Sequence, residues 1–322
     1  MWDDGSLKEI EERAVRLVRE AGAIALSGFG RPLQVAYKER SRENPVTDVD
    51  REVEAFLRSA IWESFPEHSL LGEEGDEPVP DGGDALWVVD PLDGTINFLN
   101  GLPLFACSLA LLRRGEPVVG AIYLPVAPAT ACARTQSGGE PIPVVPARGA
   151  VLHARLGGGA LLDGMPVRVS DASELEASSL SGLPGNHVRQ FKRMDGLRRR
   201  PGEPRCLGSV CFEAALVAAG VFRYAVFGKP KLWDVAAASL IVREAGGVAL
   251  RWAGDGWVDL ARFDPMPNPR SRAEAALRFW EAATLVAGAS VGGYVADRLR
   301  PLRRVGARRR VLGENSWQTE GG

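Results

Sequence analysis

Two carboxylates on one tight turn are the residues of this sequence best suited to chemistry. Asp90 and Asp93 lie three positions apart, with Pro91 between them and Gly94-Thr95 directly after them. Pro91 fixes its own φ and disfavours further ladder pairing, so the chain must turn and both carboxylates can converge on one point. Like charges at such a distance raise each other's pKa unless a cation lies between them. A divalent, oxygen-binding metal such as Mg²⁺ suits this arrangement.

The residues after the turn favour an anion beside that metal. Gly94 lets the backbone approach a ligand, and Thr95 supplies a hydroxyl. If a helix begins near Thr95, its free N–H groups form an anion site. A metal beside an anion cradle indicates phosphate chemistry. The structural alternative is a strand end followed by an Asx-type turn, with Asp93 as a helix cap.

Three further acidic positions carry weaker signals by themselves. Asp50 lies at the edge of the apolar stripe of a predicted helix, where an acid either complements the helix dipole or points inward as a ligand. Glu73-Glu74 follow a short apolar strand and lie between glycines, a pattern that is also common in surface loops. Asp234 is predicted to cap a helix that ends at Gly246-Gly247.

Regular elements that can position these acids follow from periodicity and turn residues. Helices are predicted over 6–28, with a Ser6–Glu9 capping box, over 47–65, with Thr47 or Asp48 as cap, and over 210–219, 234–247 and the end of 285–299. Strands are predicted at 31–46 (with a loop), 69–72, 85–89, 105–112, 117–123, 160–169 (a hairpin), 221–227, 248–250 and the start of 285–299. Residues 134–159 indicate a loop or insertion, and 262–280 another irregular segment.

Composition excludes several classes of protein. The 322 residues suffice for one large domain or two ordinary ones, and 45% hydrophobic with 25% charged residues is typical of soluble proteins. A net charge of −2 favours neither nucleic acid nor membrane as a partner. No apolar stretch reaches the roughly 18 residues that span a bilayer, and the acidic N-terminus is unlike a signal peptide. The scattered cysteines form no CxxC pair and indicate reduced thiols in a cytoplasmic protein: Cys107, Cys132, Cys206 and Cys211.

Taken together, these motifs resemble the inositol monophosphatase family of Mg²⁺-dependent, lithium-sensitive phosphatases. Residues 87–98 are similar to the first signature of the family, and 233–247 are similar to the second. Three shorter elements of the family are similar to segments of this chain, namely Gly72-Glu73-Glu74, Val46–Asp50 and Gly208-Ser209. The elements occur in the order of the family, and the resemblance covers roughly residues 6–300.

The resemblance implies an α+β or α/β layered fold, an alternating α-β-α-β-α sandwich of the inositol monophosphatase and fructose-1,6-bisphosphatase type. We expect an N-terminal half over 1–185 that carries the metal and phosphate site. We expect a C-terminal half over 186–300 that completes the site, followed by a polar tail over 301–322 with the basic run Arg308–Arg310. A homodimer is implied by the family as well.

The resemblance also implies metal ligands. Glu73, Asp90 and the carbonyl of Leu92 are similar to ligands of a first Mg²⁺ ion. Asp90, Asp93 and Asp234 are similar to ligands of a second ion. A third, weaker ion would be bound by Glu73 through water. Two or three Mg²⁺ ions in each active site are therefore expected, and oxygen ligands from separate segments suit them.

The remaining roles concern water and substrate. Asp50 with Thr95 is similar to the pair that orients and activates the attacking water, with Glu73 as a further catalytic residue through its metal. The amides of Gly94 and Thr95 would hold the phosphate, and Asp93 and Ser209 are assigned to substrate binding.

The substrate side departs from the family. Inositol phosphatases carry a glutamate shortly before the Trp-Asp motif, whereas the corresponding segment here, 224–233, has no acid and one additional residue. This difference argues against myo-inositol phosphate as the preferred substrate. Lys229 and Lys231 lie either in a solvated loop or in a site for a second anionic group. Lys38 is similar to a family lysine near the metals, in an uncertain register.

The sequence thus predicts a Mg²⁺-dependent phosphomonoesterase that acts on a small phosphorylated metabolite, with no nucleic acid or membrane partner. One alternative is a sibling activity on histidinol phosphate, fructose 1,6-bisphosphate or 3′-phosphoadenosine 5′-phosphate. A second alternative is a regulatory binding protein on the same fold, against which the complete set of acids argues.

Overall fold

The computed structural model describes residues 3–37, 45–75, 84–127, 149–185, 190–198, 202–268 and 271–302. Lys38, the basic run Arg308–Arg310 and most of the expected 134–159 loop lie outside the described residues. No described helix is long and apolar enough to cross a membrane.

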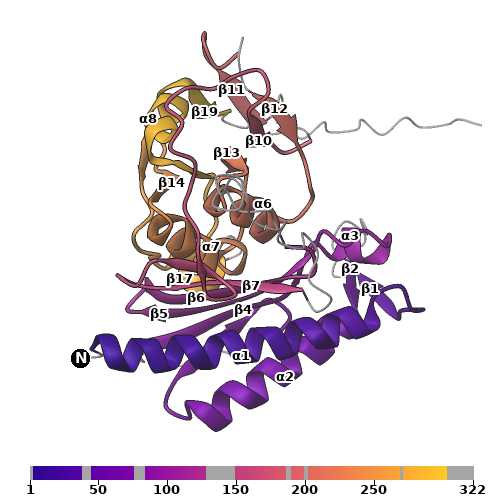
Figure 1. Ribbon diagram of the computed structural model, residues 1–322. Helices are drawn as coiled ribbons and strands as arrows, with labels where there is room; N and C mark the ends of the chain where they lie inside the picture. Colours follow the sequence, from indigo (N-terminus) through magenta and orange to yellow (C-terminus); the bar gives the residue numbers. More distant parts are fainter. Residues whose placement is uncertain are drawn as a thin grey trace, which may run out of the picture.

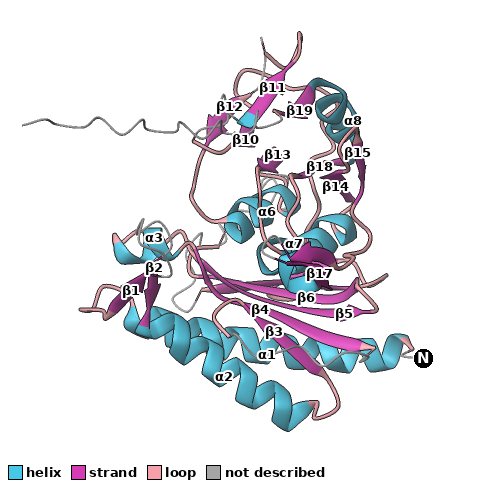
Figure 2. Ribbon diagram, turned by 180° about the vertical axis from the view of Figure 1, so that it is seen from behind, coloured by secondary structure: helices cyan, strands magenta, loops and turns pink. Residues whose placement is uncertain are grey.

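Two long helices cover one face of a seven-stranded sheet (Figures 1 and 2). The helices are α1 (Asp4–Gly28) and α2 (Asp48–Ser64). The strands lie in the order β3 (Ser69–Gly72), β4 (Ala85–Asp93), β5 (Ala106–Arg113), β6 (Glu116–Leu124), β7 (Ala150–Arg155), β8 (Ala160–Leu162) and β9 (Met165–Pro166). Only β3 and β4 are parallel within this sheet, so their carboxyl ends meet at one edge.

Two further helices, α6 (Val210–Ala218) and α7 (Leu232–Glu244), lie between this sheet and a second one (Figure 1). The second sheet has the order β12 (Glu203–Arg205), β10 (Leu180–Gly182), β13 (Phe222–Phe227), β18 (Thr284–Gly288), β14 (Gly247–Trp252) and β15 (Trp257–Asp259). Helix α8 (Ala289–Arg298) and the paired strands β11 (Phe191–Arg193) and β19 (Leu299–Pro301) lie beyond it. The predicted α-β-α-β-α sandwich is therefore confirmed.

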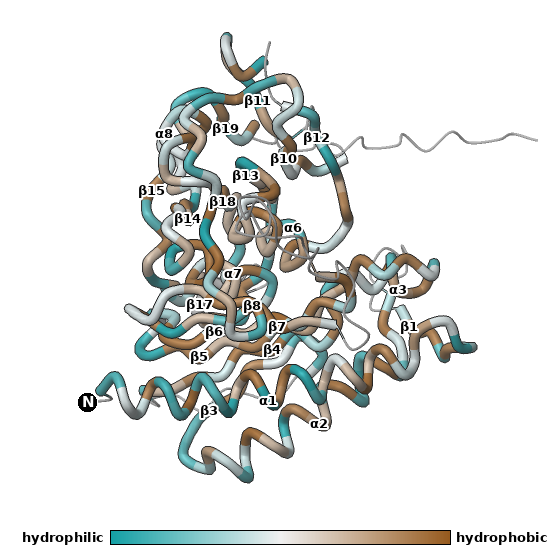
Figure 3. Tube along the Cα trace, viewed as in Figure 1, coloured by the Kyte–Doolittle hydropathy of each residue, from teal (hydrophilic) through white to brown (hydrophobic). Residues whose placement is uncertain are grey.

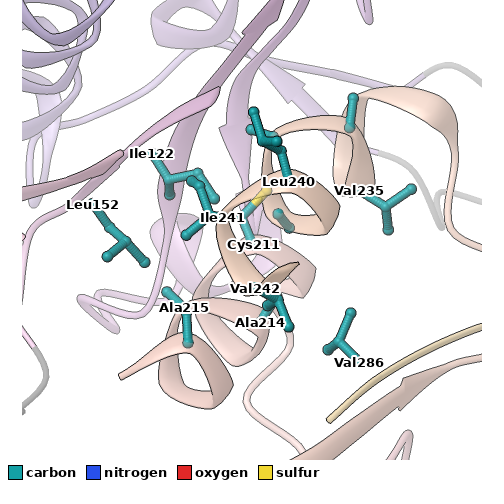
Figure 4. Close-up of a cluster of buried hydrophobic side chains, with 14 of the residues drawn as sticks. Ile122, Leu152, Cys211, Ala214, Ala215, Val235, Leu240, Ile241, Val242 and Val286 are labelled. Atoms are coloured by element: carbon teal, nitrogen blue, oxygen red, sulfur yellow. The ribbon is translucent and has the colours of Figure 1, made fainter. Parts of the chain in front are cut away.

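Burial explains the layers. In Figure 3, α1 alternates between hydrophilic and hydrophobic colours, as expected of a helix with one face on a sheet. Helices α6 and α7 are apolar almost all round because sheets cover them on both sides. Figure 4 shows where they meet: Cys211, Ala214 and Ala215 of α6 gather with Leu240, Ile241 and Val242 of α7, beside Ile122 and Leu152 of the first sheet and Val286 of the second.

Helix starts differ from prediction in two places. Asp3, not Ser6, caps α1, and its carboxylate accepts a hydrogen bond from the Ser6 amide at 2.8 Å. Helix α7 begins at Leu232, so Asp234 is not its cap but its third residue. From there its Oδ2 accepts from the Lys231 amide at 2.7 Å. Because the side chain reaches back from inside the first turn, the sequence pattern places the cap three residues late, at Asp234 in place of Lys231.

Two segments expected to be irregular contain strands. Residues 150–155, inside the expected loop over 134–159, form β7, which is buried between β6 and β8. The pattern hid this strand because it contains His153 and Arg155, two polar residues that Glu11 of α1 binds at 2.8 and 3.1 Å. Within 262–280, β16 (Met266–Asn268) and β17 (Ser271–Ala276) pair, and the short helix η1 (Leu277–Phe279) follows.

The remaining predicted elements are present. The expected strand and loop over 31–46 contains β1 (Val35–Tyr37) and β2 (Pro45–Thr47), which pair with each other. Strand β4 continues beyond the predicted end, because pairing with β5 resumes at Asp93 after a bulge at Pro91-Leu92. A bulge re-aims side chains at the end of a strand, and here it lies between the two acids of the first motif.

Candidate active site

The shared end of β3 and β4 brings the first two acids together. Glu73 follows β3, and its amide donates to the Val89 carbonyl of β4 at 3.1 Å. Asp90 is 1% exposed, and its Oδ1 accepts from the Leu92 amide at 3.1 Å. Burial, then the charge of Glu73 and those of Asp93 and Asp234, raise the pKa of Asp90 well above its usual value. The four carboxyls therefore form one electrostatic group.

Asp93 and Asp234 join this group from the other side of the bulge and from α7. The Asp93 carboxylate accepts from Ser209 Oγ and the Cys211 amide, both at 2.6 Å, and from the Val210 amide at 3.2 Å, all at the start of α6. Burial raises the pKa of Asp93 in spite of these hydrogen bonds. Burial and the charges of Asp93 and Glu73 raise the pKa of Asp234 well above its usual value. The first motif is thus joined to α6 and α7.

Asp50 and Thr95 meet at the start of α2. Thr47 caps α2, and the Asp50 Oδ2 accepts from the Thr47 amide at 2.8 Å and its hydroxyl at 2.5 Å, which completes a capping box. The other oxygen, Oδ1, faces the Thr95 hydroxyl at 3.3 Å, and that hydroxyl also lies 3.0 Å from the Leu92 carbonyl. Burial is the main reason why the pKa of Asp50 is raised. Asp50 is thus an inward-pointing acid that can accept a proton.

Gly94 allows the turn to lie against both neighbours. Its φ is 92°, and a Cβ there would lie 3.0 Å from the Leu104 carbonyl and 3.2 Å from Ser209 Cβ. The short helix α3 (Thr95–Leu99) begins at Thr95, which meets the condition stated above for an anion site there. Asn97 of α3 was not singled out from sequence, although it lies inside the first motif. Its Nδ2 donates to the Leu104 and Leu207 carbonyls at 2.7 and 2.6 Å and so holds α3 beside Ser209.

A cavity of about 370 Å³ opens beside Ser209 and Asp234. Residues from several segments line it, among them Gln190, Cys206, Glu213, Phe227 and Lys229. Lys229 and Lys231 both bind Glu281, with Nζ–O distances of 2.5 and 2.6 Å. Glu281 was missed because it lies some 50 positions along the chain, and no local pattern links it to the lysines. One carboxylate therefore pairs with two ammonium groups at this side of the cavity, which leaves an excess of one positive charge.

Glu213 is a second residue that sequence patterns did not identify. It lies within the apolar α6 and is 5% exposed, and its Oε1 accepts from the Leu207 amide at 2.7 Å. Burial raises the pKa of Glu213 to about 7, with a smaller contribution from Asp93. This carboxyl therefore changes its charge near neutral pH, at the wall of the cavity.

Glu213→Gln is expected to remove a pH dependence of stability. Because the folded pKa of Glu213 is about 7 and its ordinary value is 4.5, the folded protein binds the extra proton between these values, and stability falls as pH rises through this window. Between pH 5 and 8, wild type should lose about 2 to 3 kcal/mol of unfolding free energy relative to the variant. Urea unfolding of both proteins in EDTA measures this difference, and parallel pH profiles would contradict the assignment.

The acids fit an oxygen-binding dication by their chemistry. Within the described ranges, no group of three or more His, Cys, Asp or Glu side chains is arranged to hold a metal ion as it stands. Asp93, in particular, is directed to the start of α6. Nevertheless, the mutual repulsion that raises the pKa of Asp90 and Asp234 is the repulsion that a dication would relieve. The donor set is entirely oxygen, as Mg²⁺ prefers.

Comparisons with known proteins agree with one another. Residues 6–289 match the model described as the inositol monophosphatase family. A fructose-1,6-bisphosphatase/inositol-1-monophosphatase of Thermotoga maritima is 33% identical over 242 residues, 75% of this chain and 84% of that protein. A Nus factor SuhB of Pasteurella multocida is 33% identical over 247 residues, with coverages of 75% and 84%.

Two further matches bear on substrate and fold. A histidinol-phosphatase of Chlorobaculum parvum is 34% identical over 250 residues, 75% of this chain and 85% of that protein. The crystal structure of the extragenic suppressor protein suhB from Bartonella henselae superimposes with a TM-score of 0.67 at 25% identity, and the match covers 90% of this chain and 97% of that one.

Proposed function

The chain belongs to the inositol monophosphatase family, and from this premise we propose that it is a Mg²⁺-dependent phosphomonoesterase of a small phosphorylated metabolite. The observation that carries the proposal is the convergence of Glu73, Asp90, Asp93 and Asp234: burial, together with the charges of Glu73 and Asp93, raises the pKa of both Asp90 and Asp234. A dianionic phosphate would not approach four carboxylates unless cations lay between them.

The proposed roles follow from the contacts. Glu73, Asp90, the Leu92 carbonyl, Asp93 and Asp234 would hold two or three Mg²⁺ ions. When bound, these ions neutralise the phosphate, lower the pKa of water and stabilise the leaving alkoxide. Asp50 accepts the proton of the attacking water, and the Thr95 hydroxyl, 3.3 Å from Asp50 Oδ1, orients that water.

The remaining groups bind the substrate. The Gly94 and Thr95 amides hold the phosphate oxygens, and Gly94 at φ 92° makes the turn that places both amides at the start of α3. Ser209, which lines the cavity, and Asp93, whose Oδ2 lies 2.6 Å from Ser209 Oγ, flank the leaving group. We further propose a cytoplasmic homodimer, on the family resemblance alone.

Phosphate release from a substrate panel tests the proposal. The panel holds inositol 1-phosphate, histidinol phosphate, fructose 1,6-bisphosphate and 3′-phosphoadenosine 5′-phosphate, each with and without Mg²⁺ and with added Li⁺. Release that requires Mg²⁺ and falls with Li⁺ is the expected result. Silence across the panel by a protein that binds Mg²⁺ would favour the second candidate, a regulatory binding protein, which the Nus factor relative supports.

Lys229→Ala is expected to weaken binding of substrates that carry a second anionic group. Lys229 lines the cavity and shares Glu281 with Lys231, so the lysines exceed their common partner by one charge. The KM for a bis-anionic substrate should rise about fivefold, which corresponds to about 1 kcal/mol for an exposed charge. Glu281→Gln should lower the same KM, because it releases both ammonium groups. An unchanged KM in both variants would place the lysines outside substrate recognition, and an equal rise for a monoanionic substrate would contradict a role in binding a second anionic group.

A further inference from the structure

The turn that carries Glu73 is held by residues outside the proposed metal ligands. Glu54 of α2 accepts a hydrogen bond at its Oε2 from the Glu74 amide, at 2.8 Å. Its Oε1 lies 3.0 Å from Arg58 Nη2, and the two side chains are 7% and 15% exposed. A largely buried ion pair on α2 therefore holds the turn through the hydrogen bond from the amide of Glu74, the residue after Glu73.

Two glycines let the turn close over this pair. A Cβ at Gly72 would lie 2.3 Å from Glu54 Oε1, and a Cβ at Gly75 would lie 2.4 Å from Arg58 Nη2. Both distances are shorter than the non-bonded contacts that Cβ atoms make in proteins. The Glu54–Arg58 pair therefore fills the space that side chains at positions 72 and 75 would need. The Gly-Glu-Glu-Gly sequence is thus fitted to α2 as well as to the ligand that it presents.

A third contact reaches the turn from the other half of the chain. Arg278 of η1 donates from Nη2 to the Gly75 carbonyl, a hydrogen bond between residues 203 positions apart. The segment is itself anchored, because Trp280 is buried and packs edge-on against Phe263 with ring centroids 4.8 Å apart. Arg278 therefore reaches the turn from a segment that the packing of Trp280 on Phe263 holds in place.

We propose that Arg278 is a positioning residue that, by holding the Gly75 carbonyl against the Glu54–Arg58 pair, fixes the Glu73 carboxylate beside Asp90 and so sets the affinity for the metal ions. The inference rests on the proposed function, because it takes Glu73 as a ligand. It assigns a role to the segment 262–280, for which the sequence suggested none. Arg278 touches neither substrate nor metal in this account, and its effect is carried by the turn alone.

Arg278→Ala tests the proposal in the full-length protein. Titration calorimetry with Mg²⁺, without substrate, should show binding weakened about tenfold, the lower end of what loss of a supporting contact to a metal ligand causes. The Mg²⁺ concentration for half-maximal phosphate release should rise by the same factor, while kcat at saturating Mg²⁺ changes less than twofold. The Mg²⁺ affinity of Arg278→Lys, which keeps a donor, should lie between those of wild type and Arg278→Ala. The lysine variant replaces the alanine variant in the test if Arg278→Ala is unstable.

Arg262→Ala is the matched control. Arg262 lies in the same segment but is exposed and pairs only with Asp264, at 3.3 Å, among the described residues. Its removal should leave Mg²⁺ binding unchanged. Wild-type Mg²⁺ affinity in Arg278→Ala, or a lower melting temperature and kcat with wild-type affinity, would overturn the inference in favour of a purely structural contact. If wild type binds Mg²⁺ but hydrolyses nothing, only the proposed phosphatase activity is contradicted. The calorimetric comparison would still decide the role of Arg278. A wild type that binds no Mg²⁺ would overturn both.

Discussion

Asp90→Asn abolishes phosphate release and makes the metal-free protein more stable: this is the expected result with the largest effect. Asp90 is buried, and the charges of Glu73, Asp93 and Asp234 raise its pKa well above the usual value. The stabilising contribution of a carboxyl whose folded pKa is raised is fully present below its ordinary pKa and is lost as pH rises through the folded pKa. At neutral pH a neutral amide therefore removes a repulsion, and it can still accept from the Leu92 amide.

The same change removes a charge that the metal ions need. Loss of several kcal/mol of charge stabilisation corresponds to a fall in kcat of about 10³-fold or more. Phosphate assays and differential scanning calorimetry in EDTA measure the two effects. Opposite signs for activity and apo-stability distinguish a metal ligand from a structural acid, because loss of a structural acid lowers both.

Asp234→Asn should behave in the same way, since burial and the charges of Asp93 and Glu73 raise its pKa too. Asp93 is a poorer choice, because its carboxylate accepts three hydrogen bonds at the start of α6 and its loss would disturb that helix. Asp264→Asn, at an exposed site, is the control. Near-full Mg²⁺-dependent activity in Asp90→Asn or Asp234→Asn would show that the metal assignment is wrong.

Asp50→Asn is expected to lower kcat by about 10² to 10⁴, the usual contribution of a general base. The Mg²⁺ affinity of Asp50→Asn should equal that of wild type, because Asp50 is not among the proposed ligands. The pH–rate profile should lose its acidic limb: a base works only when deprotonated, and burial raises the pKa of Asp50 towards the range in which that limb is seen. Activity measured from pH 5 to 9 at saturating Mg²⁺ checks this.

Thr95 provides the matched pair for this experiment. Thr95→Ser keeps the hydroxyl near Asp50 Oδ1 and should retain most activity, whereas Thr95→Ala should approach Asp50→Asn. The capping box of α2 uses Asp50 Oδ2, and an asparagine oxygen can accept one of its two hydrogen bonds, so circular dichroism should show an intact fold. Wild-type kcat in Asp50→Asn would remove Asp50 from the mechanism.

Most helices and strands could be predicted because their signals are local, whereas the layered fold and the grouping of the acids were expected from the resemblance to the family. Thr47, one of the two residues expected to cap α2, does cap it, and Asp50 three positions later completes a capping box. The helix expected over 210–219 is present as α6, and a sequence that is apolar on most sides is typical of the buried helix found there. The roles given to Glu73, Asp90, Leu92, Asp93 and Asp234 remain predictions, since they come from motif resemblance.

What the sequence did not reveal depends on partners far along the chain. The polar residues His153 and Arg155 belong in a strand only because Glu11 of α1 binds them. The lysines before α7 were interpreted without Glu281, which the fold brings to them from another segment. Such pairs leave no periodic trace, because each partner alone looks like an ordinary surface charge.

The placement of α6 and α7 between two sheets has a consequence for biosynthesis. During translation, the seven strands of the first sheet, which end at Pro166, are synthesised well before α7 (Leu232–Glu244). Until then the face of that sheet that will pack on α6 and α7 is uncovered, and a nascent chain in this state presents apolar surface to chaperones. Asp234 arrives on the same helix that covers this face. Folding and assembly of the acidic cluster are thus completed by a single late event, and no earlier translation intermediate carries the whole set of acids.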